Sequence, residues 1–168
     1  MLISVDADSC TGCRACEVAC SLQHTGECRP SRSAVRVLDK EGLGVNIPVL
    51  CMQCADAPCI AACLRDALYR ADASSPILVK DESCNGCRLC LKACPLGAFH
   101  FPRETKKAVK CDLCGGNPQC VEFCASHALS FGVVAGGGRP SSANVWDVFR
   151  SGRSASAKAA AIRGELKL

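Results

Sequence analysis

The chain has 168 residues, a formal net charge of +4 and 17 cysteines, about one residue in ten. Aromatic residues make up only 4% of it, and the 49% hydrophobic content includes the cysteines. The apolar core is therefore thin, and we infer that groups bound to the cysteines help to hold the fold together. The length suits one domain or two small ones, and no apolar run reaches the roughly 18 residues that cross a bilayer.

The first ten residues, MLISVDADSC, carry no sign of an export signal. They contain no basic segment, no long apolar segment and no twin arginine. We therefore expect a cytoplasmic protein with no membrane insertion. Because thiols stay reduced in the cytoplasm, the cysteines indicate metal binding rather than disulfides, which an odd number of cysteines also fits poorly.

Sixteen of the cysteines form four motifs. The first and third motifs share the spacing C-x2-C-x2-C-x3-C and similar sequences, CTGCRAC and CNGCRLC, while the second and fourth are looser and have a proline before the third cysteine. This alternation predicts an internal duplication. The motifs are Cys10, Cys13, Cys16 and Cys20; Cys51, Cys54, Cys59 and Cys63; Cys84, Cys87, Cys90 and Cys94; and Cys111, Cys114, Cys120 and Cys124.

The spacing of the motifs predicts 4Fe-4S clusters. Three thiolates within seven residues can bind three corners of a cuboidal cluster, because so short a loop keeps its sulfurs on the inner side. The fourth cysteine follows one helical turn later and faces elsewhere, and in two-cluster ferredoxins it ligates the other cluster. Gly12 and Gly86 suit such tight loops. Structural zinc is the alternative, but zinc ribbons separate two C-x2-C pairs by about a dozen residues or more.

Short strands and helices are predicted around the motifs. Each motif is expected to lead into a short helix that contains its fourth cysteine, and residues 35–49 read as a hairpin between the first two motifs. The charges of residues 103–110 suit a solvated turn. Strands are expected at residues 3–5, 34–38, 45–49, 77–79, 98–101, 108–110 and 129–134. The prediction is an α+β fold, a duplicated ferredoxin-like arrangement with two pseudo-symmetric halves that hold two clusters each.

The motifs CTGCRACEVACS, CMQCADAPCIAAC, CNGCRLCLKACP and KCDLCGGNPQCVEFC resemble, in this order, the four-cluster ferredoxin subunits of the dimethyl sulfoxide reductase and formate dehydrogenase iron-sulfur family. The phrase HTGECRPSRSAVRV and the glycine-rich fourth motif are most similar to the small electron-transfer subunits of tungsten aldehyde oxidoreductase complexes and to hydrogenase-linked ferredoxins. Only Cys94 is followed by the proline common in ferredoxin motifs, so the exit geometry of the other three motifs is expected to differ.

The resemblance implies a nested pairing of the motifs, the first with the fourth and the second with the third. The spacing by itself would equally allow sequential pairing. The ligand sets that the resemblance implies are Cys10, Cys13, Cys16 with Cys124; Cys111, Cys114, Cys120 with Cys20; Cys51, Cys54, Cys59 with Cys94; and Cys84, Cys87, Cys90 with Cys63.

Some polar residues lie near the motifs without being ligands. Arg14 and Arg88 each follow the second cysteine of a motif, where a cation would favour the reduced cluster. An arginine in a surface ion pair is the alternative. Cys28 lies outside the motifs and is interpreted as a free thiol. The histidines, His24, His100 and His127, are interpreted as structural.

The chain is predicted to have three parts. Residues 1–134 form the four-cluster domain, residues 135–142 a glycine-rich linker and residues 143–168 a helical tail. The tail either caps its own domain or docks on another subunit or a second copy, since it carries the only tryptophan of the chain, Trp146.

The sequence contains no P-loop, dinucleotide fingerprint, HExxH motif or nucleophile elbow. We therefore expect a protein that conducts electrons and is not itself an enzyme. The resemblance implies a tungsten or molybdenum pterin catalytic subunit and a second partner such as an FAD- or NAD-linked subunit. A free polyferredoxin carrier and an assembly factor are the alternatives. Each oxidised cluster adds a charge of about −2 with its thiolates, so the positive formal charge does not indicate nucleic-acid binding.

Removal of the clusters is expected to leave the chain largely unfolded, because they fill the interior that a larger apolar core would otherwise occupy. Circular dichroism before and after treatment with an iron chelator measures this. A spectrum that keeps its native shape after cluster loss would contradict the expectation.

Overall fold

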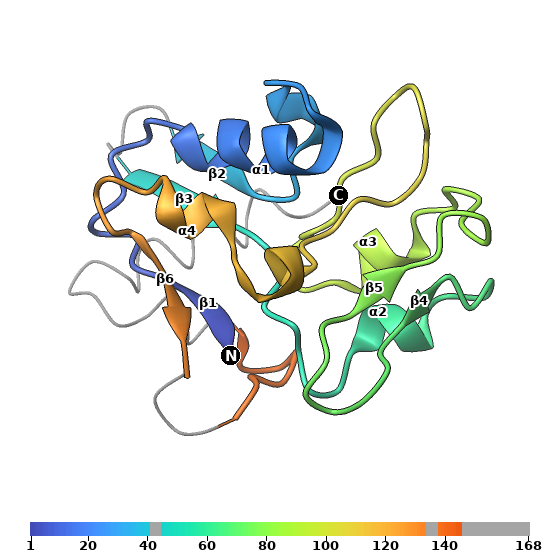
Figure 1. The fold of residues 1–168 in the computed structure, drawn as a ribbon. Helices are drawn as coiled ribbons and strands as arrows, with labels where there is room; N and C mark the ends of the chain where they lie inside the picture. The colour runs from blue at the N-terminus through green and yellow to red at the C-terminus, as the bar shows by residue number, and fades with distance from the viewer. Residues whose placement is uncertain (41–44, 134–137, 146–168) are drawn as a thin grey trace.

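Short helices and strands alternate along the chain in a computed structural model, which describes residues 1–40, 45–133 and 138–145 (Figure 1). The helices are α1 (Ala15–Thr25), α2 (Pro58–Ala61), α3 (Leu89–Ala93) and α4 (Gln119–Glu122), and two 3₁₀ turns, η1 and η2, cover Pro30–Arg32 and Leu113–Gly116. The strands are β1 (Leu2–Val5), β2 (Arg36–Lys40), β3 (Val45–Val49), β4 (Leu68–Tyr69), β5 (Leu78–Val79) and β6 (Leu129–Gly132). No helix in these ranges is long and apolar enough to cross a bilayer.

The strands form three antiparallel pairs. β1 pairs with β6, with Leu2 opposite Gly132 and Val5 opposite Leu129, so the start of the chain lies beside the end of the fourth motif. β2 and β3 form a hairpin in which Arg36 lies opposite Val49. β4 and β5 pair over two residues each, between the second and third motifs. Along the sequence, β4 and β5 lie between β1 and β6, so one strand pair is nested inside the other.

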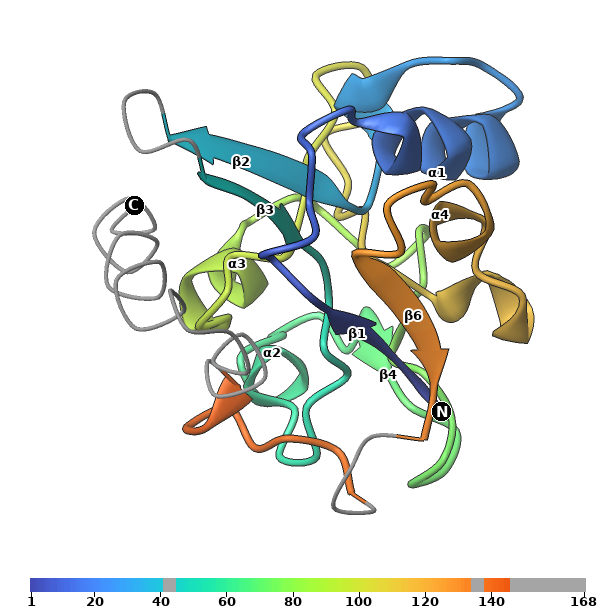
Figure 2. The ribbon, with the colours of Figure 1, turned by 90° about the vertical axis from the view of Figure 1, so that its left-hand side faces the viewer.

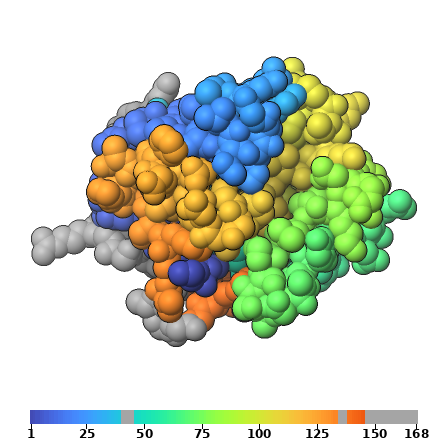
Figure 3. All heavy atoms as spheres, in the orientation of Figure 1, coloured from blue at the N-terminus to red at the C-terminus, as the bar shows by residue number. Residues whose placement is uncertain are grey.

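The helices follow the same nested order. α1 of the first motif packs on α4 of the fourth, and α2 packs on α3 (Figures 1 and 2). The first and fourth motifs form one lobe, and the second and third motifs form the other. Figure 3 shows the two lobes from outside, one in blue and orange and the other in green.

Two groups of buried residues make the core, and cysteines belong to both. The larger group joins the first lobe to the β2–β3 hairpin through side chains such as Ile3, Val35 and Leu50. The smaller group lies in the second lobe around Ile77 and Phe99. Six cysteines of the four motifs are buried in these groups, namely Cys16, Cys20, Cys59, Cys90, Cys111 and Cys120. Sulfur thus occupies positions that larger apolar side chains fill in ordinary cores.

The loops of the first and third motifs have matching backbone conformations. Gly12 and Gly86 have φ angles of 75° and 72°. Arg14 and Arg88 both adopt the left-handed conformation, at φ 59° and 63°, and the next residue of each begins α1 or α3. A left-handed residue directly before the helix turns the chain sharply, which places the cysteines on either side of it around one centre.

Most of the predicted strands are present. The hairpin over residues 35–49 is confirmed, with its turn at residues 41–44 outside the described residues, and strands occur near residues 3–5, 77–79 and 129–134. The strands expected at 98–101 and 108–110 were wrong, because a single bridge between His100 and Val109 replaces them. Pro102 has no N–H to continue that ladder. β4 was not expected.

The expectation that each helix contains the fourth cysteine of its motif holds only for Cys20 in α1. In the other motifs the helix contains the third cysteine and ends before the fourth, which follows α2, α3 or α4. Cys94 has an extended conformation, ψ 119°, because it precedes a proline. α1 is longer because neither proline nor glycine interrupts it before Gly26, which caps its end.

Residues 138–145, from the predicted linker and the start of the tail, contact the second motif. Ala55 donates a backbone hydrogen bond to Pro140 at 3.0 Å, and the backbone N–H of Ser142 donates to Asp56 at 2.8 Å. Val145 is fully buried in the larger core group. Residues 146–168 of the tail lie outside the described residues, so its helix and its docking role stay predictions.

The third-motif loop depends on the absence of a side chain at Gly86. A Cβ at Gly86 would collide with the backbone carbonyl oxygen of Lys106, whereas a Cβ at Gly26 meets nothing within 4 Å, and both residues have positive φ. We expect Gly26→Ala to destabilise the protein by about 1–2 kcal/mol through backbone strain alone. Gly86→Ala should cost clearly more and lower the iron content, as thermal unfolding and iron analysis would measure. Equal losses in the two variants would contradict this.

Candidate metal centres

The cysteines of different motifs lie together in four sets. Burial, the largest cause, and repulsion between neighbouring sulfurs together raise the pKa of Cys16, Cys54, Cys90 and Cys120 to about 12. This repulsion indicates which cysteines lie near one another, both within a set and between neighbouring sets. The sets are Cys10 and Cys16 with Cys124; Cys114 and Cys120 with Cys20; Cys51, Cys54 and Cys59 with Cys94; and Cys84 and Cys90 with Cys63.

The sets follow the nested order and not the sequential one. In each set, cysteines of one motif meet the fourth cysteine of its partner motif, as the packing of α1 on α4 and of α2 on α3 requires. Three of the predicted ligands are not among the cysteines whose mutual repulsion defines the sets. Cys13 and Cys87 are exposed in the loops of their motifs, and Cys111 is buried beside both Cys51 and Cys120.

Neighbouring sets are also close to one another. Cys16 of the first set repels Cys120 of the second. Cys111 is near both Cys120 and Cys51, and Cys90 is near Cys59. Each set thus neighbours the next in the order in which they are given above, and we call this order the row. Groups bound in them would lie in sequence across the two lobes.

The spacing of the sulfurs distinguishes clusters from zinc. Four thiolates around one zinc ion, at about 2.3 Å from it, would lie within about 4 Å of one another. Among the described residues, which include every cysteine, only His24, Asp112 and Cys114 have ligand atoms gathered within 4.8 Å. None of the seventeen cysteines forms a disulfide. The wide all-thiolate sets therefore fit a cuboidal cluster better than they fit a single ion or a disulfide.

Several sulfurs accept hydrogen bonds, which tune the potential of a bound cluster. Backbone N–H groups donate at 3.4 Å to the sulfurs of four cysteines in three of the sets. The pairs are Ala34 to Cys20, Gln53 to Cys51, Ala98 to Cys94 and Ala108 to Cys84. Gln53 lies within its motif and the other three donors follow theirs in the chain, so the folded backbone itself supplies polar contacts around the sulfurs.

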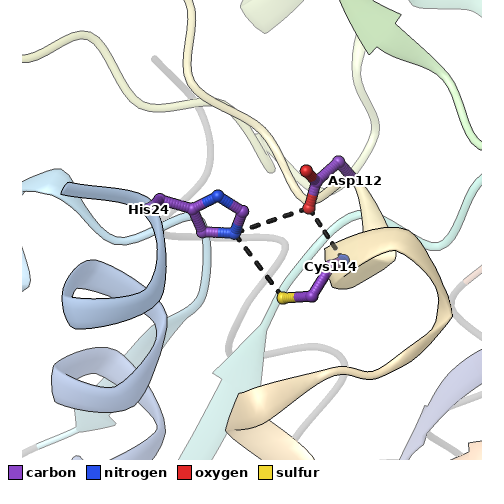
Figure 4. Close-up of side chains that lie close together, drawn as sticks. All are labelled: His24, Asp112 and Cys114. Atoms are coloured by element: carbon purple, nitrogen blue, oxygen red, sulfur yellow. Dashed lines mark hydrogen bonds and ion pairs between the residues drawn. The ribbon is translucent and has the colours of Figure 1, made fainter. Parts of the chain in front are cut away.

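His24 of α1 reaches across to the fourth motif (Figure 4). Its Nε2 lies 3.6 Å from Sγ of Cys114 and 3.5 Å from Asp112, whose carboxylate also accepts the backbone N–H of Cys114 at 2.9 Å. Hydrogen bonds with Cys114 and Cys20 raise the pKa of His24 to about 10. The ring therefore contacts two cysteines of one set, a position that the sequence analysis missed although His24 follows Cys20 by one helical turn.

Arg88, one of the two arginines that follow the second cysteine of a motif, packs its side chain on an aromatic ring. The guanidinium of Arg88 lies over the ring of Phe101, 5.5 Å from its centre. Phe101 and Arg88 also line one small cavity together with Cys63, Cys84 and Cys90, so Arg88 lies beside the cysteines of the fourth set. Arg14 has the matching backbone conformation in the first motif. Cys28 is exposed and belongs to no set.

A buried polar network joins the second and fourth motifs. The side chain of Gln53 is fully buried, donates to the backbone oxygen of Cys111 and accepts from the backbone N–H of Ile77, both at 2.8 Å. Nζ of Lys110 donates to the oxygens of Ile77 and Cys111, both at 2.9 Å. The sequence analysis missed both residues, although each directly precedes a cysteine of a motif.

Glu17 is the only buried carboxylate among the described residues. It lies on α1 and accepts a hydrogen bond from the backbone N–H of Val37 at 2.6 Å, which ties α1 to β2. After burial, its charge is the strongest cause that raises the pKa of Cys16. The first cysteine set therefore has a negative charge beside it.

These features define the protein as a cysteine-rich α+β iron-sulfur protein. The family of 4Fe-4S dicluster domains matches residues 44–134, more than half of the chain. The chain belongs to this family, and it binds 4Fe-4S clusters.

Two curated relatives extend the match beyond this domain. The polyferredoxin-like subunit of an aliphatic sulfonate oxidoreductase from Pyrococcus furiosus is 43% identical over 141 residues, which cover 82% of this chain and 80% of the relative. The electron transport protein HydN of Escherichia coli is 33% identical and covers 76% and 85%. The chain is thus an electron-transfer iron-sulfur protein related to subunits of oxidoreductase complexes.

Among solved structures, a chain of the active site complex BamBC of benzoyl coenzyme A reductase, in complex with benzoyl-CoA, is 30% identical. The match covers 76% of each chain with a TM-score of 0.46.

The negative charge at Glu17 gives a testable prediction. Glu17→Gln keeps an oxygen that can accept from Val37 but removes the charge beside Cys16, so the nearest cluster should become easier to reduce. We expect its midpoint to rise by about 59 mV, a tenfold change in a one-electron equilibrium. A redox titration followed by EPR measures the shift.

The control is Glu27→Gln, which removes an exposed carboxylate that pairs with Arg29. Solvent screens this charge, so its removal should leave the midpoints unchanged. Equal shifts in the two variants would show that the burial of Glu17 is irrelevant to the potential.

Proposed function

We propose that the sixteen cysteines of the four motifs bind four 4Fe-4S clusters with nested ligation. The proposed ligand sets are Cys10, Cys13, Cys16 and Cys124; Cys111, Cys114, Cys120 and Cys20; Cys51, Cys54, Cys59 and Cys94; and Cys84, Cys87, Cys90 and Cys63. The proximity of the fourth cysteine of each motif to the other cysteines of its partner motif supports this assignment. The matching loops of the first and third motifs support an origin of the fold by duplication into two pseudo-symmetric halves.

The function that this arrangement supports best is the relay of single electrons through an oxidoreductase complex. A 4Fe-4S cluster accepts and releases one electron at a potential set by its surroundings. The observation that carries the proposal is the row of the sets, in which Cys16 lies near Cys120, Cys111 near Cys51, and Cys59 near Cys90. The protein holds the sets in this row and is not catalytic by itself.

The partner that we propose is a catalytic subunit with a tungsten or molybdenum pterin, of the aldehyde oxidoreductase kind, together with a second redox partner such as an FAD- or NAD-linked subunit. The resemblance of the motifs supports the first partner. The Pyrococcus furiosus relative, a subunit of an oxidoreductase, supports membership of such a complex. A reducing cytoplasm is part of the proposal, because the ligands must stay reduced thiols to bind iron.

Two features of the sequence complete the proposal. Arg14 and Arg88 stand beside their motifs and would raise the potential of the clusters bound there. Residues 135–142 and 143–168 would serve as linker and docking tail, either on another subunit or on a second copy that lengthens the row. A free electron carrier is the second candidate, favoured by the relative HydN, which is described as an electron transport protein and not as a subunit.

Nested ligation has a direct test in serine variants. Cys20→Ser should alter the same EPR signal as Cys114→Ser and leave the signal altered by Cys16→Ser intact, because Cys20 would ligate the cluster of the fourth motif. Cys28→Ser, which removes the exposed cysteine outside the sets, is the control and should change none of the signals. If Cys20→Ser instead alters the signal that Cys54→Ser alters, ligation is sequential, and if it alters the signal that Cys16→Ser alters, each motif ligates its own cluster. Either result would show that the proposal is wrong.

Membership of a complex is tested by anaerobic purification of the tagged full chain from its native cells. A large pterin-containing subunit in stoichiometric amount is the expected result. Isolation of the chain alone, with its clusters intact, would favour the free carrier, and association only with cluster-free or pterin-free enzyme would favour an assembly factor.

A further inference from the structure

Lys110 is the only buried cationic side chain among the described residues, with 7% of its surface exposed. It comes directly before the fourth motif, between the two lobes. Its Nζ donates hydrogen bonds to two neutral backbone oxygens, those of Ile77 and Cys111. The ion pairs of the described residues do not include it.

A buried ammonium with only neutral partners is costly, because carbonyl dipoles replace only part of its lost hydration. Proteins keep such a charge where an opposite charge lies nearby. Among the described residues no carboxylate pairs with Nζ within 4 Å, although Asp81 and Asp112 line the same pocket as Lys110. Two predicted cluster ligands also lie near it. Nζ bonds to the backbone oxygen of Cys111 at 2.9 Å, and its charge also acts on Cys59.

Cys59 and Cys111 belong to different ligand sets. Cys59 is in the set completed by Cys94, and Cys111 is in the set completed by Cys20. These two sets are the middle pair of the row. Lys110 bonds to the oxygen of Cys111, and Gln53, which bonds to the same oxygen, donates its backbone N–H to the sulfur of Cys51 in the other set. Thiolate-bound 4Fe-4S clusters are anionic, so both middle positions would place negative charge beside this ammonium.

The surroundings hold the ammonium in place. The side chain of Gln53 donates to the backbone oxygen of Cys111 and accepts from the backbone N–H of Ile77. It therefore holds in place the same two residues whose backbone oxygens accept hydrogen bonds from Nζ of Lys110. Gln53 follows Cys51 by two residues, and its own backbone N–H donates to the sulfur of Cys51. Lys110 and Gln53 thus link the loops of the two middle sets through backbone groups and not through flexible surface side chains.

We infer that Lys110 is a counter-cation shared by the two middle clusters, a positioning residue that raises both of their potentials. Each reduction adds one negative charge, and a fixed cation in a desolvated site stabilises the reduced form. The middle pair of the row would therefore be easier to reduce than it is without Lys110. This inference rests on the ligand sets and the row proposed above.

The test uses the full chain, purified without oxygen and loaded with iron and sulfide. Lys110→Gln removes the charge but keeps an N–H donor, and Lys110→Arg keeps the charge. The matched control is Lys92→Gln, which removes an exposed lysine two residues before Cys94. Iron content and redox titration followed by EPR are measured on every variant.

In Lys110→Gln, two of the four clusters should become harder to reduce, each by at least tenfold in the one-electron equilibrium, or 59 mV. Lys110→Arg should restore both midpoints toward the wild-type values, and Lys92→Gln should leave them unchanged. If Lys110→Gln loses iron that Lys110→Arg retains, the charge is needed for loading, which also supports the inference.

Two results would overturn the inference. One is a fully loaded Lys110→Gln protein with unchanged midpoints, or with shifts no larger than those of Lys92→Gln. The other is an equal loss of iron in Lys110→Gln and Lys110→Arg, which would mean that Lys110 serves packing alone. Failure of the proposed function is recognised separately, because the wild-type protein would then lack four clusters before any lysine is changed.

Discussion

The approach of the fourth cysteine of each motif to the other cysteines of its partner motif is the constraint on which the rest of the structure depends. Because the first motif meets the fourth and the second meets the third, α1 must pack on α4 and α2 on α3. The same nested order pairs β1 with β6, although the two strands lie far apart in the sequence. Bound clusters would therefore tie together segments that are far apart in the sequence, which is the role that a large apolar core has in other folds.

The two buried charges also lie beside the cysteine sets. The described chain buries one carboxylate, Glu17, and one ammonium, Lys110, and they are not paired with each other. Glu17 lies beside the first cysteine set, and Lys110 lies near cysteines of the two middle sets. In a desolvated site such charges act on neighbouring clusters with little screening. The fold thus gives the positions of the row different electrostatic surroundings while using the same thiolate ligands in each.

The sequence was sufficient to predict what is local. The motif spacing, the glycine turns at Gly12 and Gly86 and the hairpin over residues 35–49 depend on neighbouring residues, and the structure contains all of them. The ends of α2, α3 and α4 were misjudged, because helical spacing says nothing about where a packed loop must leave the helix. The network of Gln53 and Lys110 was missed because it exists only once the second and fourth motifs meet. The nested order came from a family resemblance, since spacing allows either order.

The iron and acid-labile sulfide content of the anaerobically purified full chain, with native mass spectrometry of the same sample, tests the central claim most directly. Four clusters predict about 16 iron atoms and about 16 sulfides per chain, with no zinc. A chain that carries zinc, or that holds iron for only two clusters after complete loading, would contradict the account.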